Sequence, residues 1–218
     1  MLDYGKKTYI MGILNVTPDS FSDGGDYTNI DIAVNHAKEM IELGADMIDL
    51  GGESTRPGHK FVSAEEEISR IVPVIKRLKE EINVPISIDT YKSEVAEEAL
   101  KLGVDMVNDV WGLTYDGKMA DVVAKYDGEV CIMHNQEGTT YDKDIIESIK
   151  EFLQKSIDMA LEAGVKKEKI VLDPGIGFGK TYEQNIEVLN RLGELRDLGY
   201  PILLGTSRKS VLGKILEG

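Results

Sequence analysis

Seven short apolar runs, each ending on a polar residue, constrain the fold of this chain more than any other feature. Segments with helical periodicity lie between them. Parallel strands read as continuous apolar runs because helices cover the sheet. The polar ends of such strands converge on the face where α/β proteins bind ligands, so the pattern predicts an enzyme of this class. The runs are Ile10–Asn15, Met47–Asp49, Ile86–Asp89, Met106–Asn108, Cys131–His134, Ile170–Asp173 and Ile202–Ser207.

The alternation of runs and periodic segments gives an expected order of strands and helices. We expect strands near residues 9–14, 46–50, 86–88, 105–108, 129–133, 169–172 and 202–205. We expect helices near residues 30–43, 64–81, 92–102, 117–125, 144–164, 183–195 and from 209 onward. Ser63, followed three residues later by Glu66, is typical of a capping box at a helix start. Pro73 predicts a kink or a later start of that helix.

A repeated pattern indicates one domain built from similar units. Leu43–Asp49 is similar to Leu102–Asn108, and each contains a helix end, a glycine and the start of a strand. No low-complexity linker interrupts the chain, so we expect one domain over residues 1–218. Repeated strand–helix units form either a doubly wound sheet or a (β/α)8 barrel. Polar residues follow every run and no nucleotide fingerprint follows the first, which favours the barrel.

The charge of the chain limits its partners. A formal net charge of −14 argues against nucleic-acid binding, which needs a basic face. A few lysines and arginines in one cleft can still bind an anionic small molecule. No stretch approaches the roughly 20 apolar residues of a membrane span. The single cysteine, Cys131, excludes an intrachain disulfide, and we expect a cytoplasmic protein.

Motifs for nucleotide, zinc or covalent chemistry are missing. The segment Gly175–Thr181 matches neither the Walker nor the dinucleotide pattern, which leaves a glycine turn that either admits a ligand or is simply tight. His36, His59 and His134 are far apart in sequence, so a zinc site is disfavoured. Neither a Gly-x-Ser-x-Gly elbow nor a suitable cysteine nucleophile is present, which disfavours covalent catalysis.

Polar residues at three strand ends suit a flat heterocyclic ligand. Asp89, Asn108 and Asp173 end three different runs. Their carboxylates accept hydrogen bonds, and the amide both donates and accepts. The alternative is that each caps the loop after its strand. Thr206–Ser210 adds cations and hydroxyls that suit an anionic or electron-rich ligand, or form a surface turn. Arg56, in a long loop, is either surface or a ligand clamp.

Seven segments in register resemble dihydropteroate synthase, and the match spans the whole chain. The family is a (β/α)8 barrel in folate synthesis. It joins 4-aminobenzoate to (7,8-dihydropterin-6-yl)methyl diphosphate, releases diphosphate and is the sulfonamide target. The resemblance also implies a homodimer. The segments are Asn15–Gly25, Gly51–Gly58, Ser87–Tyr91, Asn108–Gly112, Met133–His134, Asp173–Lys180 and Ser207–Ser210.

The resemblance implies roles for individual residues. The pterin diphosphate site would comprise Thr55, Asp89, Asn108, Met133, Asp173, Phe178 and Lys209. The 4-aminobenzoate site would comprise Phe21, Thr55, Arg56, Pro57, Phe178 and Ser210. Asn15 would ligate Mg2+, and the catalytic residues would be Asp19, Asp23, Arg56 and Lys209. Diphosphate would leave with help from Mg2+ before the arylamine attacks, so no protein nucleophile is needed. Asp49 and His134 receive no role.

One departure from the family concerns the end of the chain. The family continues with an eighth strand that carries an Arg-x-His motif for diphosphate, whereas this sequence ends at Gly218. We therefore expect the sequence to be a fragment of a longer protein, and an intact mass of 24.1 kDa would contradict this.

Two other functions stay open at this point. A methyltetrahydrofolate-binding domain of a corrinoid methyltransferase would share counterparts of Asp89, Asn108 and Asp173. Arg56 and the segment Ser207–Ser210 favour the synthase over that alternative. A non-catalytic pterin-binding protein is the third interpretation, because the diphosphate motif is missing from this sequence.

Overall fold

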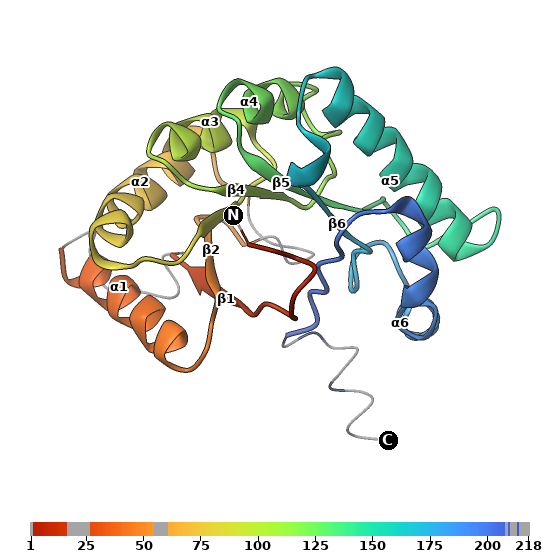
Figure 1. The fold of residues 1–218 in the computed structure, drawn as a ribbon, viewed down its shortest axis with the longest axis horizontal. Coiled ribbons are helices and arrows are strands. Elements are labelled where there is room, and N and C mark those ends of the chain that lie inside the picture. The colour runs from red at the N-terminus through yellow and green to blue at the C-terminus, as the bar shows by residue number, and fades with distance from the viewer. Residues whose placement is uncertain (1, 17–26, 55–60, 208, 210–212, 214–218) are drawn as a thin grey trace.

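Parallel strands, joined by helices, form one curved sheet in this chain (Figure 1). The computed structural model describes residues 2–16, 27–54, 61–207, 209 and 213. Among these residues six strands form a sheet in the order β1-β2-β3-β4-β5-β6, and every neighbouring pair is parallel. The strands are β1 Met11–Asn15, β2 Met47–Gly51, β3 Ile86–Asp89, β4 Met106–Asp109, β5 Glu129–Met133 and β6 Ile170–Asp173. Sequential order is what repeated right-handed strand–helix units produce.

Helices α1 to α5 line the outer side of the curved sheet in Figure 1. The helices are α1 Tyr27–Glu42, α2 Ala64–Glu81, α3 Ser93–Lys101, α4 Met119–Lys125, α5 Ile145–Glu162 and α6 Tyr182–Asn190. Two 3-10 helices, η2 Lys167–Lys169 and η3 Leu192–Leu198, complete the elements of the described residues. None of the helices in this part of the chain is long and apolar enough to span a membrane.

The first six predicted strands are confirmed, and the seventh forms only a bridge. Ile202 pairs with Leu172 of β6 as an isolated parallel bridge. Two backbone hydrogen bonds hold it, from Leu172 N–H to Pro201 O at 2.9 Å and from Leu203 N–H to Leu172 O at 2.8 Å. The seventh run therefore lies beside β6, in the order that the sequence predicts. The helix expected from residue 209 onward falls mostly outside the described residues.

Three expectations about helices need correction. Ser63 Oγ does accept the Glu66 N–H at 3.2 Å, but the Glu66 carboxylate pairs with Arg70, so only half of the predicted capping box forms. Of the kink or later start expected from Pro73, the later start is wrong, because α2 begins at Ala64 and continues through Pro73. The helix predicted over 183–195 ends at Asn190 and continues as η3, which contains Gly193, a poor helix former.

Alternation along the strands separates the core from the site. Ile48 and Leu50 of β2, with their counterparts on β3 to β6, pack with the helices in the main core. The intervening residues belong to the other face of the sheet. On that face of β2, β4 and β6 an apolar residue comes first and a polar residue follows it, whereas the inner-facing residues of β3 begin with Ser87 and those of β5 run from Glu129 to Met133. The apolar cluster on that face consists of Met47, Met106, Cys131 and Val171, with Leu2, Tyr4, Met11 and Leu203 packed against it.

The core under α2 gives a direct stability prediction. Ile75 is 0% exposed, whereas Ile32 on α1 is 51% exposed. Ile75→Ala should lower the free energy of unfolding by about 2–5 kcal/mol, because it removes buried methyl groups and leaves a cavity. Ile32→Ala should change it by less than about 0.5 kcal/mol. Urea unfolding of both variants measures the difference, and equal losses would contradict the assigned packing.

Candidate active site

The polar ends of the strands meet on the inner face of the sheet. Asp49, Asp89, Asn108 and Asp173 each lie two residues beyond an inner-facing residue of β2, β3, β4 or β6. The strand register places Asp89 opposite Asn108, and Met133 opposite Asp173. Side chains from distant parts of the sequence therefore gather at one end of the sheet, as the apolar runs predicted.

Asp173 is a buried carboxylate with one oxygen committed to the protein. Its Oδ1 accepts the Gly175 N–H at 2.7 Å. Burial raises the pKa of the Asp173 carboxyl, and this N–H together with the charges of Lys209 and Lys180 opposes the rise. A Cβ on Gly205 would lie 3.7 Å from Asp173 Oδ2 and 3.6 Å from Lys209 Nζ. The Asp173 carboxylate and the Lys209 ammonium group therefore both lie close to Gly205, where a side chain would come between them.

Lys209 covers one side of the site. Its Nζ donates to Ile176 O and lies 4.8 Å from the centre of the Phe178 ring. Burial lowers the pKa of Lys209, and the carboxylates of Asp173 and Asp89 oppose that change. Phe178 also packs against a small cluster that contains Met133. Lys209, Phe178 and Met133 therefore supply a cation and apolar walls next to the strand-end carboxylates.

Asp49 is a site residue to which the sequence assigned no role. Asn108 Nδ2 donates to Asp49 Oδ2 at 3.1 Å, which fixes the orientation of the Asn108 amide. Asp49 Oδ1 is buried and has no hydrogen-bond partner within the described part of the chain. Burial raises the pKa of the Asp49 carboxyl, and the neighbouring side chains of Ser87 and Asn108 oppose the rise. Its place at the end of the second apolar run was the signal that could have identified it.

His134, the other unassigned strand end, supports the glycine loop after β6. Lys180 Nζ lies 2.9 Å from His134 Nδ1, 2.9 Å from Gly175 O and 3.0 Å from Phe178 O. Burial lowers the pKa of His134 to about 3, with a further contribution from the Lys180 charge, so the ring is neutral near pH 7. Burial also lowers the pKa of Lys180 to about 7. The buried lysine thus holds the loop that presents Phe178.

An oxygen-rich rim could take part in binding a hydrated cation. Gly51 separates Asn15 at the end of β1 from Asp89, because a Cβ on Gly51 would lie 3.4 Å from Asn15 Oδ1 and 3.6 Å from Asp89 Oδ2. Among the described residues no three His, Cys, Asp or Glu side chains form a metal cage. One amide oxygen suits Mg2+, which keeps several waters and binds through the oxygens of a phosphate substrate. The residues present therefore fit such an ion.

The structure brings together seven of the site residues that were predicted from the sequence. Register and contacts place the described members at the same end of the sheet, namely Asn15, Asp89, Asn108, Met133, Asp173, Phe178 and Lys209. The remaining members lie outside the described residues and are Asp19, Phe21, Asp23, Thr55, Arg56, Pro57 and Ser210.

Comparison with known proteins identifies the class to which this fold and site belong. The model of the pterin-binding enzyme family matches residues 11–218. The chain therefore belongs to the pterin-binding enzymes, which agrees with carboxylates and an amide at the strand ends. Its fold is that of the (β/α)8 barrels of this family, as predicted.

The relatives narrow the class to dihydropteroate synthases. The chain is 60% identical over 213 residues to a dihydropteroate synthase of Clostridium beijerinckii, covering 98% of this chain and 79% of the relative. A Clostridium difficile dihydropteroate synthase solved in the presence of pteroic acid matches this structure with a TM-score of 0.97 and 73% sequence identity. The match covers 100% of this chain and 83% of the Clostridium difficile chain. The Xanthomonas albilineans enzyme with 4-aminobenzoic acid has a TM-score of 0.91 and 42% identity over 97% and 77% of the two chains.

Gly175 offers a test of the loop geometry. Its φ is +71°, and a Cβ there would lie 1.9 Å from His134 O. Gly199 has a similar φ of +77° but nothing within 4 Å of such a Cβ. Gly199→Ala should cost about 1–2 kcal/mol of unfolding free energy for its left-handed backbone alone. Gly175→Ala should cost clearly more because it also displaces the end of β5. Equal costs in urea unfolding would show that the loop does not press against His134.

Proposed function

We propose that this chain joins 4-aminobenzoate to (7,8-dihydropterin-6-yl)methyl diphosphate and releases diphosphate, as a dihydropteroate synthase. The observation that carries the proposal is the meeting of Asp89, Asn108 and Asp173 on the inner face of the sheet, beside Lys209 and Phe178. The relatives that the chain matches are named as synthases, so methyl transfer to a corrinoid is not proposed.

The strand-end residues would bind the pterin ring. The pyrimidine edge of a dihydropterin presents a row of N–H donors, and a carboxylate offers only acceptors. Asp173 would accept from that edge, and Asp89 with the Asn108 amide would hold the rest of the ring. Asp49 supports this set because it fixes the Asn108 amide through the 3.1 Å hydrogen bond. Met133, Phe178 and Lys209 would cover the flat faces of the ring.

The reaction breaks the bond from the methylene carbon to the diphosphate oxygen and forms a bond from that carbon to the arylamine nitrogen. The leaving diphosphate keeps the electron pair, and the attacking nitrogen then loses a proton. Mg2+ bound at Asn15 would supply positive charge for the diphosphate. Lys209 would act on the ring side, and the protein would contribute mainly positioning and electrostatic stabilisation.

Residues outside the described part of the chain complete the proposal. Asp19, Asp23 and Arg56 would act in catalysis, and Arg56 would also bind 4-aminobenzoate. The other members of that subsite would be Phe21, Thr55, Pro57 and Ser210, together with Phe178 from the described part of the chain. Sulfonamides would compete with 4-aminobenzoate for this subsite. These residue roles are supported by the position of the residues in the segments that resemble the family.

Three broader expectations remain proposals. We propose a single domain over residues 1–218, supported by the continuous sheet from β1 to β6. A homodimer and a cytoplasmic location are expected from the family resemblance and the single buried cysteine. Light scattering of the purified chain would measure the oligomeric state.

Asp173→Asn tests the pterin site. The amide replaces one acceptor by a donor, so the variant should lose about 2–5 kcal/mol of pterin binding free energy. The matched control is Asp197→Asn, an exposed carboxylate paired with Lys150 at 2.7 Å. Calorimetry measures binding, and diphosphate release with pterin diphosphate, Mg2+ and 4-aminobenzoate measures turnover. An unchanged dissociation constant would contradict the site, and binding without release by the unaltered chain would support a non-catalytic protein.

Arg56→Ala tests the division of the site between the two substrates. Loss of the guanidinium should raise the KM for 4-aminobenzoate by more than tenfold, because its carboxylate loses a charged partner, and should spare pterin binding. Arg196→Ala, which removes an exposed arginine of η3, is the control. Steady-state kinetics with each substrate varied in turn provides the measurement. Equal weakening of both substrates would refute the division.

A further inference from the structure

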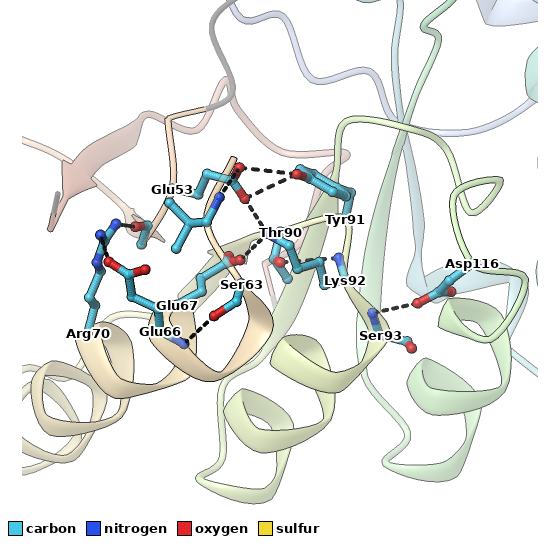
Figure 2. A network of polar contacts seen from close by, with 12 residues as sticks. Glu53, Ser63, Glu66, Glu67, Arg70, Thr90, Tyr91, Lys92, Ser93 and Asp116 are labelled. Atoms are coloured by element: carbon cyan, nitrogen blue, oxygen red, sulfur yellow. Dashed lines mark hydrogen bonds and ion pairs between the residues drawn. The ribbon is translucent and has the colours of Figure 1, made fainter. Parts of the chain in front are cut away.

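A buried ionic cluster is formed by Glu53, which follows β2, Lys92, which follows β3, and Glu67 of α2 (Figure 2). Lys92 Nζ donates to Glu53 Oε2 and to Glu67 Oε2, the latter at 2.7 Å. The Tyr91 hydroxyl lies 3.2 Å from Glu53 Oε1 and 3.1 Å from Glu53 Oε2. Lys92, Glu53 and Glu67 are 6%, 2% and 1% exposed. The Lys92 ammonium group thus forms ion pairs with two carboxylates, and all three groups are buried from water.

This cluster is a costly way to stabilise a fold. Removing charges from water costs several kcal/mol per ion, and apolar residues of similar size are often as stabilising. The proposed reaction uses none of these four side chains directly. Burial raises the pKa of the Glu67 carboxyl, and Lys92 opposes the rise, so this carboxylate depends on the lysine for its charge. The arrangement therefore calls for a role other than stability alone.

The contacts of Glu53 identify that role. Glu53 lies two residues after β2, and its Oε1 accepts the Val62 N–H at 3.2 Å. One carboxylate thus connects the residues on either side of the segment 55–60. Lys92 Nζ also lies 5.2 Å from the centre of the Phe61 ring, next to Val62. Both ends of the segment that contains Arg56 are therefore held by the same buried ion pair.

Lys92 links these ends to the strand that carries Asp89. Lys92 lies three residues after Asp89 and immediately before α3. The next residue, Ser93, anchors the start of α3 because its N–H donates to Asp116 Oδ2 at 2.9 Å. Glu67 connects the same ammonium group to α2. The cluster thus connects the residues before and after the segment 55–60 to the end of β3, which carries Asp89 of the proposed pterin site.

We propose that Glu53, Glu67 and Lys92 are positioning residues that set where the segment carrying Arg56 begins and ends, and thereby set the affinity for 4-aminobenzoate. The inference rests on the proposed function and deepens it. The three residues act through the chain they hold, without touching either substrate. A cluster that only joined α2 to α3 would stabilise the protein without favouring one substrate.

Kinetics of Lys92 variants separate the two roles. Lys92→Met keeps most of the side-chain volume but leaves both carboxylates without their cation. It should raise the KM for 4-aminobenzoate at least tenfold and leave the dissociation constant of pterin diphosphate within twofold. Lys92→Arg keeps the charge and should restore most of the affinity. Lys101→Met, which removes an exposed lysine of α3 paired with Glu98 at 2.7 Å, should change neither constant.

Glu53→Gln keeps the experiment decisive if Lys92→Met does not fold. The amide retains an oxygen for Val62 but loses the charge that faces Lys92, so the same selective rise in KM is expected. A lower melting temperature with both substrate constants unchanged would overturn the positioning role, as would an equal rise for both substrates. Diphosphate release by the unaltered chain must be present in either case, and its absence would overturn the proposed function and the inference with it.

Discussion

The two-residue alternation of the parallel strands is the constraint on which this structure depends. Residues such as Ile48 and Ile88 enter the core beneath the helices. Their neighbours face the inside of the curved sheet, and on β2, β4 and β6 an apolar residue there is followed by the polar Asp49, Asn108 or Asp173. Because burial of the outer residues fixes the register, a shift by one residue would move every polar group to the wrong face. The stability of the core and the geometry of the site thus have a common origin.

Burial of the strand-end carboxyls has a cost that a ligand can offset. The pKa values of Asp49 and Asp173 are raised, chiefly by burial. A carboxyl with a raised pKa in the fold favours the protonated form, so its cost to stability grows as the pH rises above the ordinary carboxyl range. A ligand with N–H donors favours the charged form and reverses this effect. The cations of Lys209 and Lys180 give partial compensation before a ligand binds.

Much of the fold could be predicted from the sequence because the signals are local. Apolar runs and periodic segments placed six strands and most helices within a few residues. The seventh run forms a single bridge at Ile202, and the helix predicted beyond residue 190 changes to η3. Both differences depend on hydrogen bonding that composition does not determine.

The candidate site was less accessible to sequence reasoning where it depends on long-range contacts. Strand ends identified Asp89, Asn108 and Asp173. The hydrogen bond from Asn108 to Asp49 joins residues 59 positions apart, and the contact of Lys180 with His134 spans 46 positions. No local pattern reveals such pairs. The cluster of Glu53, Glu67 and Lys92 was also missed, because its contacts span 39 and 25 positions of the sequence. In addition, a glutamate on a helix face, such as Glu67, ordinarily indicates solvent exposure.

The central claim is that the inner-face strand ends form the pterin site. A crystal structure of the chain with bound 7,8-dihydropterin tests it most directly. The account predicts that the ring lies against Asp89, Asn108 and Asp173, with Asp173 accepting from its pyrimidine edge and Lys209 next to its face. A ring bound elsewhere, or one that leaves Asp173 without contact, would contradict the account.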